Sequence, residues 1–335
     1  MRLADVVGHD AAVTHLARAA ESGRVAGAYL LVGPTGIGKR ALADAFAARL
    51  LCATPGGGDA CGRCGECTRV AAGTHPDLRI VARDSDRRDI RIEQARDLIR
   101  WLVLRPMTAP RKVALIDGAE YLNDHGQNAL LKTLEEPPGS AVLILVAAAP
   151  SMLLPTVRSR CQRVRLDPLP REVVERLLRA RDVPPERARV LAAQSGGSVG
   201  RALELADDAY VHVRTRVLEE LLRLRERTAA DLSAAAQELG KGAVDAALAV
   251  CTSWYRDVLG RTLTSGALVN PDYAAAIEHA ARETSPPRAL RQLELVCDTI
   301  RDVERNANRV LAIETLLLAL REIERGGRSY VAWAS

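Results

Sequence analysis

Three short runs of apolar residues in the first half of the chain have the length of β-strands. They are AYLLVG (Ala28–Gly33), KVALID (Lys112–Asp117) and AVLILVAAA (Ala141–Ala149). A strand that reads as one continuous apolar run is buried on both faces, which is typical of parallel sheets. An Ala/Leu-rich segment from about Lys39 to Leu51 follows the first run and predicts a helix. The pattern therefore predicts an α/β fold with a parallel sheet.

The pattern changes near Asp167–Pro170, where two prolines interrupt the chain, and no later segment resembles a strand. The segments REVVERLLRARDV, PERARVLAAQS and VGRALELAD predict three short helices that end near Asp208. Longer Leu/Ala/Val-rich segments then predict helices up to Glu324, with breaks at Asn270–Pro271 and Pro286–Pro287. We therefore predict an α/β domain over 1–166, a small helical lid over 167–209 and an all-helical domain over 210–335.

The composition narrows the functions that such a chain can have. With 335 residues, several domains are expected. The net charge of +5 permits contact with nucleic acid without requiring it. One Phe, three Trp and six Tyr are too few for binding single strands by stacking, so any DNA contact should run through Arg, Lys and helix N-termini to phosphates.

The chain lacks a run of the ~20 apolar residues that a membrane span needs, and its first residues do not resemble a signal peptide, so we expect a cytoplasmic protein.

A glycine-rich turn between the first strand and the first long helix predicts a phosphate-binding loop. GPTGIGK fits the pattern G-x-x-x-x-G-K, in which backbone N–H groups surround the phosphates and the lysine reaches the β- and γ-oxygens. The alternative is a strand-to-helix turn without a ligand. The candidate ATP-binding residues are Gly33, Pro34, Thr35, Gly36, Ile37, Gly38, Lys39, Arg40 and Asp117.

Several groups that ATP hydrolysis requires are missing around this loop. Arg40 replaces the Ser or Thr whose hydroxyl binds Mg²⁺, and a guanidinium repels a cation. Asp117 could be the acid on the metal side, but Gly118 follows it where an AAA+ ATPase carries Glu, and Glu120 should point elsewhere. Ala147–Ala149 stand where a polar residue would sense the γ-phosphate. We predict that the domain binds nucleotide weakly at most and does not hydrolyse it.

Four cysteines lie close together in a Gly/Cys-rich insertion over 52–73. Cys52, Cys61, Cys64 and Cys67 have two x2 steps, a spacing that suits a tetrahedral, structural Zn²⁺ site. The reducing cytosol argues against disulfides. An iron–sulfur cluster or redox thiols are the alternatives, although the wide first gap and the lack of a following proline favour zinc.

Several segments together resemble the clamp-loader subunits of bacterial DNA polymerase III, which are AAA+ proteins. They are VVGHDAAVTHLARAAESGRVAGAYLLVGPTGIGKR, the four-cysteine insertion, HPDLRIV, IRIEQARDLI, NALLKTLEEPP (Asn128–Pro138) and LLPTVRSRC (Leu153–Cys161). NANRVLAIETLLLAL (Asn306–Leu320) is similar to the last helix of the C-terminal collar. Within the family, Arg40, Gly118 and Gly200, which stands where motor subunits carry a sensor arginine, resemble the non-hydrolysing delta-prime type.

The resemblance implies a scaffold subunit of the polymerase holoenzyme. Its partners would be motor (gamma/tau) subunits and a delta subunit in a hetero-pentamer, with primed DNA and the sliding clamp reached through the complex. Arg160 of the segment Ser159–Cys161 would act in trans as an arginine finger on a neighbour's ATP, and its alternative role is a local ion pair. Trp254 and Tyr255 would anchor sister subunits or belong to an intramolecular core. The competing functions are an active ATPase motor and a free-standing zinc-containing DNA-binding protein.

Overall fold

The computed structural model describes residues 2–83, 89–264, 266–305 and 307–326. The chain forms two compact units: residues 1–177 with 196–201, and residues 178–195 with 202–335. The predicted lid, 167–209, is thus divided between the two units, and the division into three domains stays a prediction. Asn306 and the last nine residues of the predicted C-terminal domain lie outside the described residues.

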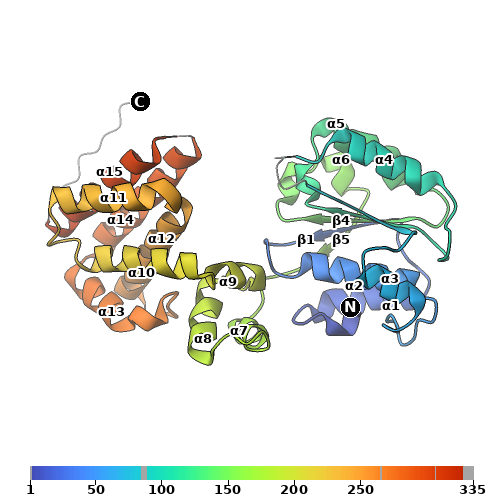
Figure 1. The fold of residues 1–335 in the computed structure, drawn as a ribbon, viewed down its shortest axis with the longest axis horizontal. Helices are drawn as coiled ribbons and strands as arrows, with labels where there is room; N and C mark the ends of the chain where they lie inside the picture. Colours follow the sequence, from blue (N-terminus) through green and yellow to red (C-terminus); the bar gives the residue numbers. More distant parts are fainter. Residues whose placement is uncertain (1, 84–88, 265, 306, 327–335) are drawn as a thin grey trace. The chain divides into compact units, whose positions relative to one another are not determined.

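The first unit is built on a parallel sheet. Its strands are β1 (Ala28–Val32), β2 (Leu78–Ala82), β3 (Val113–Asp117), β4 (Val142–Ala147) and β5 (Gln162–Arg165). Their order is β2-β3-β4-β1-β5, and all four strand pairs are parallel. The predicted α/β class with a parallel sheet is confirmed, and the three apolar runs form β1, β3 and β4 (Figure 1).

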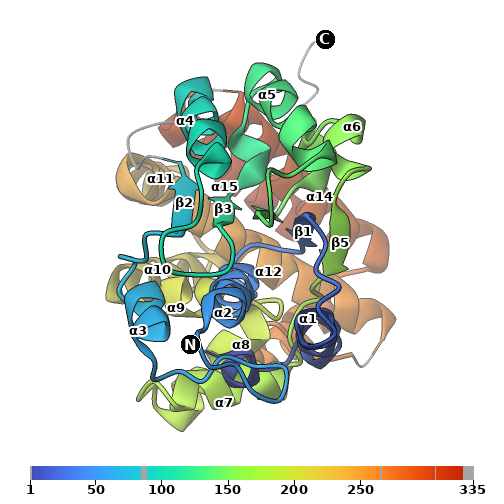
Figure 2. The same cartoon turned by 90° about the vertical axis from the view of Figure 1, so that its right-hand side faces the viewer.

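Helices cover both faces of this sheet. On one face lie α1 (Asp10–Glu21) and α2 (Lys39–Leu51), and on the other lie α4 (Ile92–Val103), α5 (Asp124–Glu135) and α6 (Pro155–Arg158), as Figures 1 and 2 show. Alternate residues of each strand face opposite layers, so that Tyr29 packs edge-on against Phe46 of α2 at 5.1 Å between ring centroids, whereas Leu30 joins the other core. Short 3-10 turns complete the unit, η1 (Leu3–Asp5), η2 (Ala119–Tyr121) and η3 (Pro150–Met152).

The two edge strands and one short helix do not follow from the apolar pattern. β2 and β5 each bury one residue fully, Val81 and Val164, because an edge strand is covered less than a central one. The cysteine-rich insertion contains the helix α3 (Gly65–Ala71), in which Cys64 is the N-cap and its sulfur accepts from the Cys67 N–H. Its residues are too few to display a helical period.

Among the described residues, the second unit consists of helices and the loops that join them. Its helices are α8 (Pro185–Gln194), α10 (Asp208–Leu222), α11 (Ala229–Gly242), α12 (Val244–Leu263), α13 (Ala274–Glu283), α14 (Pro286–Glu304) and α15 (Arg309–Glu324), with a 3-10 turn η4 (Pro271–Tyr273). Helices α7 (Arg171–Arg179) and α9 (Val199–Leu205) each cross a boundary between the units. The predicted breaks at Asn270–Pro271 and Pro286–Pro287 fall at the starts of η4 and α14. None of the helices in the described ranges is long and apolar enough to cross a membrane.

Helix α12 runs through the core of this unit. Trp254 and Tyr255 expose 3% and 1% of their surface, so both belong to the intramolecular core. The Tyr255 hydroxyl donates to Glu324 Oε1 of α15 at 3.4 Å. Burial raises the pKa of the Glu324 carboxyl to about 7 and raises that of the Tyr255 hydroxyl well above its usual value.

We expect the stability of the helical unit to fall as pH rises, because of Glu324. Between the unfolded pKa of 4.5 and the folded pKa of about 7, the folded state keeps a proton that the unfolded state has lost. The free energy of unfolding should therefore decrease by about 2–3 kcal/mol from pH 4 to pH 8, and Glu324→Gln should remove this part of the decrease. Urea unfolding at both pH values measures it, with exposed Glu322→Gln as the control. Equal pH slopes in the wild type and Glu324→Gln would contradict the assignment.

Candidate functional site

The predicted phosphate loop joins the end of β1 to the start of α2. It lies at the carboxyl edge of the parallel sheet, where open α/β sheets bind their ligands. The loop is fixed from behind by His9, whose buried imidazole Nε2 donates to the Ile37 carbonyl at 2.7 Å. Because a carbonyl only accepts, this contact assigns the proton to Nε2 of His9.

Lys39, the first residue of α2, folds back onto the loop. Its Nζ donates to the carbonyls of Gly33 at 2.7 Å and Pro34 at 2.6 Å. The side chain is buried, and burial lowers the pKa of the ammonium, while the nearby carboxylates of Glu120 and Asp117 oppose this shift. The lysine thus has backbone partners of its own without a phosphate.

Arg40, which stands where the loop pattern has a metal-binding hydroxyl, pairs with two carboxylates. Its Nε donates to Asp44 Oδ1 at 2.9 Å, and its Nη1 donates to Asp117 Oδ2 at 2.8 Å. The structure therefore brings Asp117 beside the loop, but the carboxylate faces a guanidinium. A fixed positive charge at this point competes with a divalent cation for the same carboxylate.

The segment 196–201 packs against the loop and bonds to its backbone. Ser198 Oγ donates to the Thr35 carbonyl at 2.9 Å, and the Gly200 N–H donates to the Gly36 carbonyl at 2.9 Å. Gly36 has φ +73°, and a Cβ at Gly200 would lie 2.8 Å from the Gly36 Cα. A side chain at position 200, such as the sensor arginine of a motor subunit, does not fit this arrangement.

Glu120 lies in η2, beyond the end of β3, as its spacing from Asp117 predicts. Its Oε1 accepts from the backbone N–H groups of Ala148 at 2.8 Å and Ala149 at 3.4 Å, at the tip of β4. The carboxylate is therefore engaged by the backbone. Sequence reasoning did not find this contact, because it depends on how the ends of two neighbouring strands meet.

The four cysteines come together at one point next to α2. Their sulfur atoms all lie within 4.8 Å of one another, with Cys52–Cys64 at 3.8 Å and Cys61–Cys67 at 4.0 Å. Four sulfurs bound at ~2.3 Å to one tetrahedral Zn²⁺ would lie about 3.8 Å apart. The donor set and its spacing fit a metal ion of that kind.

Backbone hydrogen bonds to these sulfurs favour the thiolate form that binds a cation. The N–H groups of Cys61 and Cys64 donate to the sulfurs of Cys52 and Cys61, each at 3.3 Å. Hydrogen bonds, first that with the Thr54 hydroxyl, lower the pKa of Cys61 to about 5, whereas burial raises the pKa of Cys67 to about 12. Thiolates this close repel one another, which favours protonated thiols in the absence of a metal. Binding of a cation requires the thiolate form and would therefore release protons.

The cysteine module is anchored to the rest of the unit by carboxylates. Asp59 accepts from the N–H groups of Leu3 and Ala4 at 2.9 and 3.0 Å. Glu66, between two of the cysteines, lies 2.7 Å from Nε2 of the buried His75 and accepts from the Thr108 hydroxyl at 3.2 Å. Burial lowers the pKa of His75. These contacts were not predicted, since Asp59 and Glu66 bond to residues 42 to 56 positions away and no spacing pattern marks the pair of Glu66 with His75.

Arg160 lies between α6 and β5, away from the cysteine module. Its guanidinium forms an ion pair with Glu135, the last residue of α5, and donates to the Thr156 carbonyl at 2.9 Å. The side chain is 32% exposed. The local ion pair considered for Arg160 is therefore present, and the guanidinium remains partly accessible to a neighbouring molecule.

Comparisons with known proteins agree along most of the chain. Residues 8–170 match a family model described as DNA polymerase III, delta subunit, and residues 210–322 match the model of its C-terminal part. The chain is 37% identical to the DNA polymerase III subunit delta' of Pseudomonas aeruginosa, over 87% of this chain and 90% of that protein. It is 31% identical to the subunit delta' of Escherichia coli, over 90% of each. It is 36% identical to the subunit tau of Escherichia coli, over 62% of this chain and 32% of tau.

Proposed function

Because the chain belongs to the family of DNA polymerase III delta-prime subunits, we propose that it is a clamp-loader scaffold that does not hydrolyse ATP itself. It assembles in the cytoplasm with motor subunits and a delta subunit in a hetero-pentamer. Through this complex it takes part in placing the sliding clamp on primed DNA during replication.

The ion pair between Arg40 and Asp117 is the observation that supports this proposal most directly. The same carboxylate would have to help bind Mg²⁺ in a working ATPase, since the metal neutralises charge on the phosphates. Here it is bonded to a residue that stays protonated at any physiological pH. Nucleotide binding at residues 33–40 is then weak or absent, and hydrolysis is lost.

Arg160 supplies the chemistry that the chain's own loop lacks. As an arginine finger it would enter the ATP site of a neighbouring motor subunit and neutralise charge on the transferring phosphoryl group. Glu135 and the Thr156 carbonyl hold the guanidinium in one orientation until the neighbour binds, which reduces the ordering cost at the interface.

The four cysteines would hold one structural Zn²⁺. With Cys52, Cys61, Cys64 and Cys67 as its ligands the ion has no open position, so it stabilises the insertion and takes no part in catalysis. Its fixed geometry would keep Glu66 against His75 and Asp59 against the N-terminal turn.

The purified chain is expected to show no ATP turnover above background, alone or with primed DNA. The reason is that Arg40 competes for the metal side of its loop. A phosphate-release assay at saturating Mg²⁺ and ATP measures this, with a motor subunit prepared identically as the positive control. Turnover at the motor's rate would replace the scaffold role with that of an ATPase motor.

Assembly is tested separately by size-exclusion chromatography. Mixed with the motor and delta subunits, the chain is expected to elute in one complex with both. Elution of the chain by itself at every mixing ratio would favour a free-standing DNA-binding protein.

A further inference from the structure

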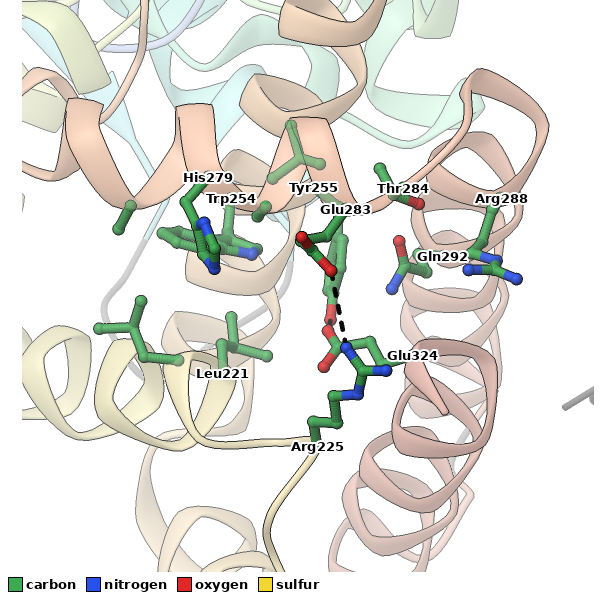
Figure 3. A pocket seen from close by; sticks show the side chains of 14 residues that line it. Leu221, Arg225, Trp254, Tyr255, His279, Glu283, Thr284, Arg288, Gln292 and Glu324 are labelled. Carbon is green, nitrogen blue, oxygen red and sulfur yellow. Dashed lines mark hydrogen bonds and ion pairs between the residues drawn. The ribbon is translucent and has the colours of Figure 1, made fainter. Parts of the chain in front are cut away.

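A pocket in the helical unit has no role in the scheme above. It lies between α10, α12, α13, α14 and the end of α15, and its cavity volume is about 190 Å³ (Figure 3). The residues that matter for its chemistry are Leu221, Leu222, Trp254, Ala280, Glu283 and Gln292.

One end of the pocket is apolar. Leu221, Leu222 and Trp254 line it, and Ala276 and Ala280 of α13 close it from the other side. Leu222 is 47% exposed, so its side chain is accessible to solvent. An apolar cavity of roughly 150 Å³ admits benzene, so this one can take a single aromatic or branched aliphatic side chain.

The other end presents an amide that lacks a partner. Gln292 is 3% exposed, yet none of the residues that the structure describes forms a hydrogen bond with its side chain. Figure 3 shows Gln292 beside Thr284 at the end opposite Trp254. The buried Thr284 Oγ1 likewise has no hydrogen-bond partner among the described residues. Buried polar groups are normally paired, so two unpaired groups in one pocket favour a ligand that forms hydrogen bonds with them.

The charged groups around the pocket balance one another. Arg225 Nη1 lies 3.7 Å from Glu283 Oε2, and Glu324 contacts the Tyr255 hydroxyl (Figure 3). Arg288 adds one positive charge near the glutamine end. With both signs present, the pocket does not select an ion of one charge. The groups without partners, an amide and a hydroxyl, are neutral and can both donate and accept.

We propose that this pocket binds a peptide segment of a partner protein, with one apolar side chain between Leu221, Trp254 and Ala280 and a backbone amide paired with Gln292. The N–H and C=O of one residue in an extended peptide point to the same side, and together they can pair with a carboxamide side chain. A purely apolar molecule would fill the same volume and leave Gln292 unpaired. This site is independent of Arg160 and of the phosphate loop.

The test is a titration of the full chain with N-acetyl-leucinamide, followed by the fluorescence of Trp254 in a Trp101→Phe/Trp333→Phe background. We expect a saturable change with a Kd on the order of 1 mM, as befits a ligand of this size. N-acetyl-glycinamide has the same amide without the side chain and should not saturate in that range. 3-Methylbutanol has the side chain without the amide and should bind more weakly.

Two variants locate the site. Gln292→Met keeps the volume and should weaken N-acetyl-leucinamide about tenfold, while Ala280→Leu fills the apolar end and should abolish the signal. Gln237→Met, an exposed glutamine of α11, is the matched control and should bind as the wild type does. The proposal is overturned if the wild type does not saturate, or if neither variant changes binding. It is equally overturned if 3-methylbutanol binds as tightly as the amide and ignores Gln292→Met.

Discussion

Replacing Arg160 with alanine is expected to slow ATP hydrolysis at one motor site of the reconstituted loader by roughly 10³-fold, the lower end of the range for arginine fingers. The physical reason is that a guanidinium delivered from a neighbour neutralises charge that develops on the transferring phosphoryl group. Single-turnover hydrolysis and clamp loading on primed DNA measure the loss. Assembly should be intact, since the side chain is partly exposed and its polar partners within the described residues are Glu135 and Thr156.

Arg165→Ala is the matched control for this variant. Arg165 is the last residue of β5, and its ion pair with Asp167 is well exposed, so its removal should change neither hydrolysis nor loading. Arg160→Lys keeps the charge but loses the planar fork, and it should recover only part of the rate. Unchanged turnover in Arg160→Ala would remove this residue from catalysis and leave it with its ion pair to Glu135.

Replacing Cys64 with serine is expected to lose the bound zinc and to destabilise the first unit by several kcal/mol. Cys64 is a predicted ligand, and its sulfur also caps α3, so the loss affects both the metal and the helix. For a unit of this size, such a loss corresponds to a decrease of about 10 °C in Tm. Metal analysis should give one zinc per wild-type chain and none for the variant.

Cys297→Ser is the control, because this half-buried thiol of α14 lies outside the cluster. A strong chelator should reproduce the effect of Cys64→Ser on the wild type and have no further effect on the variant. A wild-type protein that is fully folded without metal would contradict the zinc assignment. Visible absorption from iron in the purified protein would favour an iron–sulfur cluster.

The central strands could be predicted because a strand buried on both faces has apolar residues at nearly every position. β1, β3 and β4 are continuous apolar runs for that reason. β5 carries Gln162, Arg163 and Arg165 because it is an edge strand, and the same letters would suit an exposed loop. The seven residues of α3 are too few for a periodic pattern, and their structure depends on the neighbouring cysteines.

Part of the candidate site could likewise be predicted from the sequence, and part of it could not. The loop and the cysteine set are local patterns, so their residues could be proposed from spacing alone. The partners that define their state are not local: Asp117 is 77 residues from Arg40, and Ser198 is 163 residues from Thr35. The absence of a hydroxyl at position 40 could be read from the sequence. That the guanidinium turns inward and bonds Asp117 required the fold.

The bond between Arg40 and Asp117 also bears on how the subunit behaves while its neighbours cycle. A protein that binds a ligand only when folded gains stability with the logarithm of the ligand concentration. Arg40 already gives Asp117 the positive charge that a bound Mg²⁺ would otherwise bring, so this part of the stability should not depend on the concentration of the metal ion. We therefore expect the melting temperature of the isolated subunit to change little between low and high concentrations of Mg²⁺ with ATP, in contrast to a motor subunit that binds both.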